Sequence, residues 1–599
     1  MRSSFVLIPW VLAVLAAPAF SQQAAIDARQ AAPEAASGST VKPLVTAHHH
    51  MVVAANPYAA QAGLEILRAG GSAVDAAVAV QMVLNLVEPQ SSGIGGGAFI
   101  LTFNAKTKRV ESIDGRETAP AAAQPDRFLL PGGKERPFDE AVNSGLSTGV
   151  PGVLAALRLA HDRGGKLPWK QLFEPAIRLA ANGFAVSPRL AKLLSDQGPD
   201  GFNPEAMAYF FDGDGHPRKA GDTLSNPQFA ASLRTIADGG PDAFYKGPLA
   251  ARIVSTLKLA PRVAGDMVAA DLEGYQAKLR EPVCVAYRDA RVCGMGPPSS
   301  GGTTIAMTFG MLGAQDLALG IAPKPGDADA LLADPAASRA AILIAEAEKL
   351  AYADRDQYIA DPDWVPQAST LTDPGYLAAR AKLIDLAHPA VKALPGTPPL
   401  KAGWLYGTDA TTEHSGTSHV SIVDDDGNGL AMTTSIETAF GSRLMVGGFL
   451  LNNQLTDFSF RPVDDKGRPI ANRVEPGKRP RSSMAPTIVL GADGGLLAVL
   501  GAPGGSRIIL YDVKAIVCLL DWHCDAEEAA DLPGFGSRNG PFEVEAGTSA
   551  ETALGPLAAK AGESVTAAEM NTGVHIIVRR GDVLEGGADR RREGVALGD

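Results

Sequence analysis

Thr417 is the residue of this sequence best placed to serve as a nucleophile. It follows Gly416 at the end of a loop-like stretch and opens the segment TSHVSIVD, whose alternating pattern predicts a β-strand. A threonine hydroxyl within a chain is a weak nucleophile, but at a free N-terminus the α-amine beside it, with a pKa of about 8, can act as its base. The junction therefore suggests self-cleavage before Thr417 followed by acyl transfer. An ordinary loop end ahead of a strand can have the same local sequence. The junction alone therefore does not distinguish a self-cleavage site from a loop end.

Two glycines further along could stabilise the negative charge that develops in such a reaction. Gly504 and Gly505 lie in GAPGGSR, between the predicted strand LLAVL and the apolar helical segment IILYDVKAIVCLL. Glycines at the start of a helix let backbone N–H groups point toward an oxyanion near the positive end of the helix dipole. A tight strand-to-helix turn is the structural alternative for this pair.

Other motifs that could bind a metal or a nucleotide do not have the required pattern. His48, His49 and His50 are adjacent and cannot all converge on one ion, so a solvated loop is expected for them. The sequence contains no HExxH motif and no paired CxxC motifs. The glycine-rich loop in SSGIGGGAFILTF lacks GKS or GKT and precedes a strand instead of following one. We therefore expect neither a metal nor a cofactor.

The elements that must position these residues predict an α+β fold. Helical patterns dominate the first two thirds of the chain: Asn56 caps a helix that begins at Pro57, and Ser72 with Asp75 resembles a capping box before the apolar segment VDAAVAVQMVLNLV. From Thr417 onward strands predominate, in the hairpins TSHVSIVD to LAMTTSI and PTIVL to LLAVL. Helices packed over antiparallel sheet are the expected arrangement.

Composition and the first residues predict an exported protein. The chain of 599 residues has a net charge of -12 and no basic stripe, which argues against nucleic acid as a partner. Residues 1–21 have the positive start, short apolar run and small terminal residues of a cleavable signal peptide, and the run is too short to span a membrane. A mobile leader is expected over 22–44. We expect secretion to the periplasm, without a stable membrane anchor.

The four cysteines would then lie in a compartment that permits disulfides. Cys284 and Cys293 flank VAYRDARV, which predicts a hairpin whose strands would place the two cysteines opposite each other. A disulfide and two buried thiols are both compatible with this placement. Cys518 and Cys524 are spaced so that they do not share a helical face, and we make no prediction for this pair.

Long motifs in a fixed order resemble the γ-glutamyltranspeptidase family. Downstream of residue 416 they are TSHVSIVDDDGNG, SIETAFGS, LLNNQLTDFS, PGKRPRSSMAPTIV and GAPGGSRII. Upstream they are ANPYAAQAGLEILRAGGSAVDAAVA, SSGIGGGAFILT, IDGRETAP and STGVPGV, so the resemblance extends from about residue 45 to the C-terminus. It implies an N-terminal-nucleophile hydrolase fold, an αββα sandwich with two antiparallel sheets between helical layers. It also implies a large subunit (45–416) and a small subunit (417–599) cut from one precursor.

The resemblance assigns catalytic roles to the residues already singled out. Thr417 is the implied nucleophile and, with Gly416, the cleavage site. Ser435 stands where the family has a threonine whose hydroxyl supports the nucleophile, and Gly504 and Gly505 match the oxyanion-hole pair. The upstream run TTEHS superficially mimics the nucleophile motif, but it lacks the directly following strand and turn, which favours Thr417.

A γ-glutamyl group carries a free α-amine and α-carboxylate, and the resemblance implies a binding residue for each. Arg116, with Ser482 and Ser483, would bind the carboxylate, and Gln454 with Asp457 would bind the amine. Glu437 departs from the asparagine of well-studied members and makes the amine side of the pocket more negative.

The implied reaction transfers the γ-glutamyl group of glutathione or related amides to water or to amino-acid and peptide acceptors, through a γ-glutamyl-threonine intermediate. Segment 458–480 is shorter than the lid loop of the enteric bacterial members and contains no tyrosine, which leaves the balance of hydrolysis and transfer open. Two alternatives stay open. One is a cephalosporin or glutaryl acylase of the same fold, which prefers acyl groups without the α-amine, and the other is an exported binding protein that lost catalysis.

Overall fold

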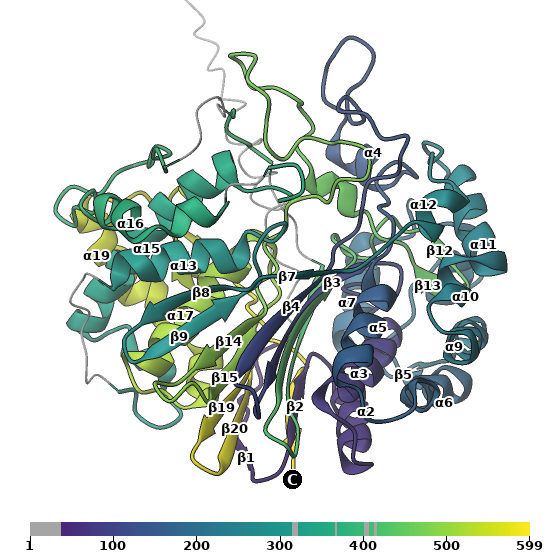
Figure 1. Cartoon of the computed structure of the whole chain (residues 1–599), viewed down its shortest axis with the longest axis horizontal. Helices are drawn as coiled ribbons and strands as arrows, with labels where there is room; N and C mark the ends of the chain where they lie inside the picture. Colours follow the sequence, from purple (N-terminus) through teal and green to yellow (C-terminus); the bar gives the residue numbers. More distant parts are fainter. Residues whose placement is uncertain (1–37, 314–321, 366–367, 400–405, 412–415) are drawn as a thin grey trace, which may run out of the picture.

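Two antiparallel sheets stacked face to face lie at the centre of the protein, and helices cover the outer face of each sheet (Figure 1). This computed structural model describes residues 38–313, 322–365, 368–399, 406–411 and 416–599. The expected signal peptide and most of the expected leader lie outside the described residues. None of the described helices is both long and apolar enough to cross a membrane. The αββα sandwich predicted by the family resemblance is confirmed.

The sheet that contains Thr417, called the Thr417 sheet below, has seven strands in the order β21-β2-β10-β11-β3-β4-β7. Their bounds are β2 (Met51–Ala54), β3 (Gly97–Asn104), β4 (Arg109–Gly115), β7 (Lys278–Arg280), β10 (Thr417–Val423), β11 (Gly429–Ser435) and β21 (Val595–Gly598). Strands that precede position 417 in the sequence are interleaved in this sheet with strands from 417 onward. The sheet is therefore continuous only because both parts of the chain contribute.

The second sheet also has seven strands, in the order β1-β20-β19-β15-β14-β9-β8. Their bounds are β1 (Val45–Ala47), β8 (Val283–Tyr287), β9 (Ala290–Gly294), β14 (Thr487–Leu490), β15 (Leu496–Gly501), β19 (His575–Arg580) and β20 (Val583–Ala588). The predicted hairpins correspond to β10 with β11 and to β14 with β15. A smaller sheet holds β16 (Phe535–Gly536), β17 (Phe542–Glu545) and β18 (Val565–Ala568).

Helices on the two outer faces come from different parts of the chain (Figure 1). Over the Thr417 sheet lie α2 (Pro57–Arg68), α3 (Ala73–Val87) and α5 (Val153–Gly164), followed outward by α6 (Glu174–Asn182), α7 (Pro188–Gln197), α9 (Pro227–Gly239), α10 (Asp242–Tyr245), α11 (Gly247–Lys258) and α12 (Ala269–Glu273). Over the second sheet lie α13 (Gly301–Leu312), α15 (Pro335–Tyr358), α16 (Pro374–Ala381), α17 (Ile508–Leu520), α18 (Ala526–Asp531) and α19 (Gly555–Ala561).

The predicted helix starts are confirmed, because their capping residues act locally. The Asn56 side chain accepts a hydrogen bond from the backbone N–H of Tyr58 at the start of α2. Ser72 and Asp75 form a reciprocal capping box at the start of α3. Every residue of α3 is buried, as its apolar sequence predicts, and this helix packs directly against β10 and β11. It therefore supports the strand that begins at Thr417.

Alternation along β10 aims Thr417 at the interface between the sheets. Val420 and Ile422 pack in the cluster formed with α2 and α3, whereas Val423 packs in the cluster that contains the second sheet. Thr417 lies on the same side as Val423, because the side-chain period of a strand is two. His419 and Ser421 lie between them on this face, and the His419 ring is hydrogen-bonded to Thr433 across the strand pair.

Both cysteine pairs are disulfides in this structure. Cys284 and Cys293 are directly opposite residues in the β8–β9 hairpin, as predicted from their spacing. The second bridge was not predicted. Cys518 lies in α17, but Cys524 follows the end of this helix, and the chain turns back so that the two Cα atoms are 5.3 Å apart.

Candidate active site

The hydroxyl of Thr417 belongs to a buried hydrogen-bond relay that includes the carbonyl before it. Thr417 Oγ1 donates to Ser435 Oγ over 3.3 Å, and Ser435 Oγ donates to the carbonyl oxygen of Gly416 over 2.9 Å. The backbone N–H of Glu437 donates to the same serine oxygen over 2.8 Å. Ser435 therefore contacts both the candidate nucleophile and the carbonyl of the bond to be cut.

Strand register brings these residues together. Thr417, the first residue of β10, is directly opposite Ser435, the last residue of β11. The chain then turns sharply, with Glu437 at a positive φ of 80°. A side chain at Gly416 would overlap the backbone carbonyl of Glu437, because a Cβ built there lies 2.0 Å from that oxygen. A glycine is thus required immediately before Thr417.

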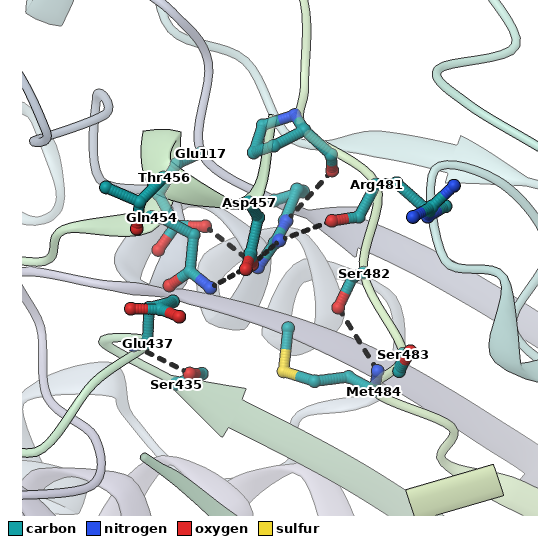
Figure 2. A network of polar contacts seen from close by, with 12 residues as sticks. Glu117, Ser435, Glu437, Gln454, Thr456, Asp457, Arg481, Ser482, Ser483 and Met484 are labelled. Atoms are coloured by element: carbon teal, nitrogen blue, oxygen red, sulfur yellow. Dashed lines mark hydrogen bonds and ion pairs between the residues drawn. The ribbon is translucent and has the colours of Figure 1, made fainter. Parts of the chain in front are cut away.

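A small pocket beside Thr417 collects most of the predicted site residues (Figure 2). It is lined by Thr417, Ser435, Glu437, Gln454, Asp457, Ser482, Ser483, Met484, Gly505 and Ile508. Residues predicted as substrate-binding, nucleophilic and oxyanion-stabilising therefore meet at one place. Three predicted residues, Arg116, Gly416 and Gly504, are not part of this lining.

Arg116 lies against Asp457 and is fully buried. Its Nη2 donates to Asp457 Oδ2 over 2.5 Å and to the carbonyl oxygen of Arg481 over 2.8 Å, and its Nε donates to the Pro480 carbonyl over 3.1 Å. Gln454 Nε2 donates to the same Asp457 oxygen over 3.0 Å. The arrangement fixes one carboxylate oxygen of Asp457 at the pocket wall (Figure 2).

Glu117, which the sequence analysis did not single out, is buried next to Arg116. Its Oε2 lies 3.7 Å from Arg116 Nη1, and neither atom has a hydrogen-bond partner among the described residues. Burial raises the pKa of Glu117 to about 8. Glu117 directly follows Arg116 in the DGRETAP motif, and this adjacency is the sequence feature that could have identified it.

The wall formed by Ser482 and Ser483 is held by the first two thirds of the chain. The backbone N–H and the hydroxyl of Ser300 both donate to the Ser482 carbonyl, over 2.7 and 2.8 Å. Arg355 Nη2 donates to Ser483 Oγ over 2.8 Å. Ser300 lies in GPPSSGGTT, one of the glycine- and proline-rich segments of the sequence, whereas nothing in the sequence singles out Arg355.

Asn453 is a further residue that sequence reasoning missed. Its side-chain nitrogen donates to a carboxylate oxygen of Glu437, and its side-chain oxygen accepts from the backbone N–H of Thr438 over 3.0 Å. Asn453 therefore orients Glu437 in the pocket, and its position beside Gln454 in NNQLTDF was the only available indication.

Gly504 and Gly505 form the turn between β15 and α17. Their φ angles are 138° and 58°, which glycine adopts readily and other residues do not. Gly505 lines the pocket with Thr417, at the start of a short helical turn that continues into α17. This placement at a helix start is the one predicted for an oxyanion-binding pair.

The upstream run that resembles the nucleophile motif begins at Thr411, and its remaining residues, 412–415, lie outside the described part of the chain. Thr411 itself bonds to Asp409, since its hydroxyl donates to Asp409 Oδ1 over 2.6 Å. By contrast, Thr417 opens a strand and faces the pocket.

Histidines and carboxylates show no metal-type grouping at this pocket in the described residues. The one group with ligand atoms close enough to share an ion is exposed and consists of Asp212, Asp214 and His216. His48 and His49 are exposed in the turn between β1 and β2, as expected, while His50 is buried and lies 3.1 Å from Asp425.

The fold and the threonine at the start of a central strand define a protein of the N-terminal-nucleophile hydrolase class. A family profile described as Gamma-glutamyltranspeptidase matches residues 59–599. A protein named "Glutathione hydrolase proenzyme" from Escherichia coli (strain K12) is 38% identical over 558 residues, which cover 91% of each chain. The chain therefore belongs to the γ-glutamyltranspeptidase family.

One solved structure agrees with this assignment, and a second shares the fold alone. The chain resembles a γ-glutamyltranspeptidase of Helicobacter pylori with a TM-score of 0.52 and 30% identity, over 61% of this chain and 99% of that one. A cephalosporin acylase of Bacillus halodurans shares the fold with a TM-score of 0.77 at 24% identity, over 95% of this chain and 99% of that one.

Proposed function

We propose that the chain cuts itself before Thr417 and then transfers γ-glutamyl groups from glutathione and related amides to water or to amino-acid and peptide acceptors. The observation that carries this proposal is the relay from Thr417 through Ser435 to the Gly416 carbonyl, next to a pocket with carboxylates and hydroxyls on its walls. The two products of the cut would stay together as large and small subunits, because their strands alternate in the Thr417 sheet.

In the self-cleavage step, Thr417 Oγ1 attacks the carbonyl carbon of Gly416. The hydroxyl of Ser435 already bonds to the carbonyl oxygen and stabilises the negative charge that develops on it. The C–N bond breaks and the proton lost by the Thr417 hydroxyl is taken up by the threonine nitrogen, which leaves an ester between Gly416 and the threonine oxygen. Water then hydrolyses this ester, and the products are a carboxylate at Gly416 and a free α-amine at Thr417.

In the acyl-transfer step, the freed α-amine accepts the proton of Thr417 Oγ1 while this oxygen attacks the γ-carbonyl of the donor. The N–H groups of Gly504 and Gly505 stabilise the tetrahedral oxyanion, and the leaving amine departs with a proton. Water or an acceptor amine then releases the γ-glutamyl group from the threonine ester.

The donor's α-amine and α-carboxylate are assigned to opposite groups of side chains. Asp457, Gln454 and Glu437 lie on one wall of the pocket and offer negative charge and an amide to the ammonium group. Ser482 and Ser483 offer hydroxyls to the carboxylate. Arg116, the residue predicted for the carboxylate, is fully buried behind this wall with its Nη1 3.7 Å from Glu117 Oε2, and it contacts the wall through Asp457 and the Arg481 carbonyl.

An acylase of the same fold is the competing function, and the carboxylate-rich wall favours the γ-glutamyl reading. Acyl groups without an α-amine would bring no positive charge to the pocket wall that carries the Asp457 and Glu437 carboxylates, where Arg116 pairs with Asp457 from behind. The test compares the γ-glutamyl and glutaryl p-nitroanilides with the purified protein. We expect a kcat/KM at least tenfold higher for the γ-glutamyl compound. A preference for the glutaryl compound would refute the proposed substrate, and activity on neither would favour the binding-protein alternative.

A further inference from the structure

A buried ion-pair cluster outside the pocket holds the turn that carries Gly504 and Gly505. We propose that Glu543, through Arg507 and Arg538, is a positioning residue for the oxyanion-binding amides. This inference rests on the proposed acyl-transfer chemistry, but not on the identity of the acyl group.

The turn needs external support because its own residues do not fix it. Two successive glycines at positive φ have more conformational freedom than any other pair of residues. Stabilisation of an oxyanion requires N–H groups aimed correctly before the reaction, and a displacement of about 1 Å can lower a rate by roughly a hundredfold. Residues that fix the next part of the turn, Ser506 and Arg507, therefore control where the glycine amides point.

The carboxylate of Glu543 ties two arginines to this turn. Arg507 Nε donates to Glu543 Oε2 over 2.6 Å, and Arg538 Nε donates to Glu543 Oε1 over 2.8 Å. Arg538 Nη1 also donates to Ser506 Oγ over 2.8 Å. Each carboxylate oxygen thus serves one guanidinium, and both guanidiniums are connected to the residues that follow Gly505.

A second contact secures the turn from another element. The hydroxyl of Tyr352 in α15 donates to the backbone carbonyl of Ser506 over 2.5 Å. On the other side, the ring of Tyr511 lies so close to Gly504 that a Cβ there would come within 2.6 Å of it. The turn is therefore held between α15, α17 and β17, and Glu543 holds it through charge.

Burial makes the charge of Glu543 important. Its side chain and that of Arg507 are both less than 10% exposed, and the pKa of Glu543 is lowered by the two arginines despite the opposing effect of burial. If the carboxylate becomes an amide, two guanidiniums compete for one weaker acceptor, the amide oxygen. Ser506 and Arg507, whose side chains belong to this cluster, are then expected to shift.

Glu543→Gln is the principal test, and Glu545→Gln is its matched control. Glu545 lies two residues further along β17 and also makes a buried ion pair, with Arg591 Nε at 2.5 Å and Nη2 at 2.9 Å, but this pair does not contact the turn. Both variants lose one buried carboxylate charge from the same strand, and of the two carboxylates Glu543 is the one whose partners connect to the glycine turn.

Each variant would be purified as the full chain and assayed with whichever acyl p-nitroanilide the wild type accepts. The result then does not depend on whether the proposed preference for γ-glutamyl groups is correct. We expect kcat to fall about 10- to 100-fold for Glu543→Gln. KM should stay within about twofold. The affinity for a boronic-acid analogue, which forms a tetrahedral adduct on the threonine, should weaken by the same factor as kcat, and that for glutamate should not change. Self-cleavage should proceed at the wild-type rate, because Ser435 and not the glycine turn contacts the Gly416 carbonyl.

The inference would be wrong if kcat and boronate affinity of Glu543→Gln matched those of Glu545→Gln. Charge alone predicts the opposite change, since loss of a carboxylate near an oxyanion should favour the oxyanion. If Glu543→Gln does not fold, Arg538→Met tests the same connection at Ser506, with Arg538→Lys as the conservative variant. A kcat of Arg538→Met equal to that of the lysine variant and the wild type would likewise overturn the proposal.

Discussion

Replacing Ser435 with alanine should slow self-cleavage far more than it destabilises the fold. The serine hydroxyl is the donor to the Gly416 carbonyl at 2.9 Å and the acceptor for Thr417 Oγ1 at 3.3 Å. Loss of one donor to a developing oxyanion typically costs about 10² to 10³ in rate, or roughly 3 to 4 kcal/mol of activation free energy. We expect a slowing of this size for Ser435→Ala.

The effect on folding stability should be smaller. Ser435 Oγ also accepts the backbone N–H of Glu437 over 2.8 Å, and alanine leaves this buried N–H without its acceptor. An unsatisfied buried donor costs about 1 to 3 kcal/mol. The fold should survive this loss, because the strand pairing of β10 with β11 and with β2 is unaffected.

A time course on a denaturing gel measures the effect directly. Purified Ser435→Ala should persist as the uncut chain for at least a hundred times longer than the wild type, while its circular dichroism and melting profile stay cooperative. Ser435→Thr keeps the hydroxyl and is the residue expected at this position in the family, so it should mature at close to the wild-type rate. Maturation of Ser435→Ala at the wild-type rate would refute the role assigned to this hydroxyl.

Three further predictions follow from individual contacts. Asp457→Asn removes the charge that pairs with Arg116 and faces the pocket, so steady-state kinetics should show a roughly 10- to 100-fold higher KM for γ-glutamyl donors, with self-cleavage unchanged on a gel; an unaltered KM would contradict the assigned amine-binding role. Glu117 keeps its proton in the fold up to a pKa of about 8, while the unfolded chain loses it near the ordinary 4.5, so between these values each pH unit lowers the free energy of unfolding by about 1.4 kcal/mol. Glu117→Gln removes this dependence, and its stability relative to the wild type, measured in urea, should therefore rise steadily from pH 5 to 8; a constant difference would mean that the carboxyl is already ionised in the fold. Ser72→Ala breaks the capping box with Asp75 and should cost about 1 kcal/mol in urea unfolding; a loss below a few tenths would show that α3 does not depend on its cap.

Features set by neighbouring residues could be predicted from the sequence. The capping box of α3, the two hairpins and the β8–β9 cysteine pair all depend on residues within about ten positions of each other, where spacing carries the information. The positions of the proposed nucleophile and of the glycine turn also follow from local patterns, although the functions proposed for them required the family resemblance.

Contacts between distant parts of the chain could not be predicted in this way. Arg116 and Asp457 are 341 residues apart, and no local pattern indicates that they form an ion pair. The disulfide between Cys518 and Cys524 depends on where α17 ends and how the chain turns afterwards. The connection from Glu543 to the glycine turn depends on the small sheet packing beside α17, and a glutamate in a strand pattern gives no indication of it.

N-terminal sequencing of the purified, active protein tests the central claim most directly. The account predicts two polypeptides, one of which begins at Thr417 with a free α-amine, and a single uncut, inactive polypeptide for Thr417→Ala. Activity from a chain that is still continuous between Gly416 and Thr417 would contradict it, because the base of the proposed reaction exists only after that bond is broken.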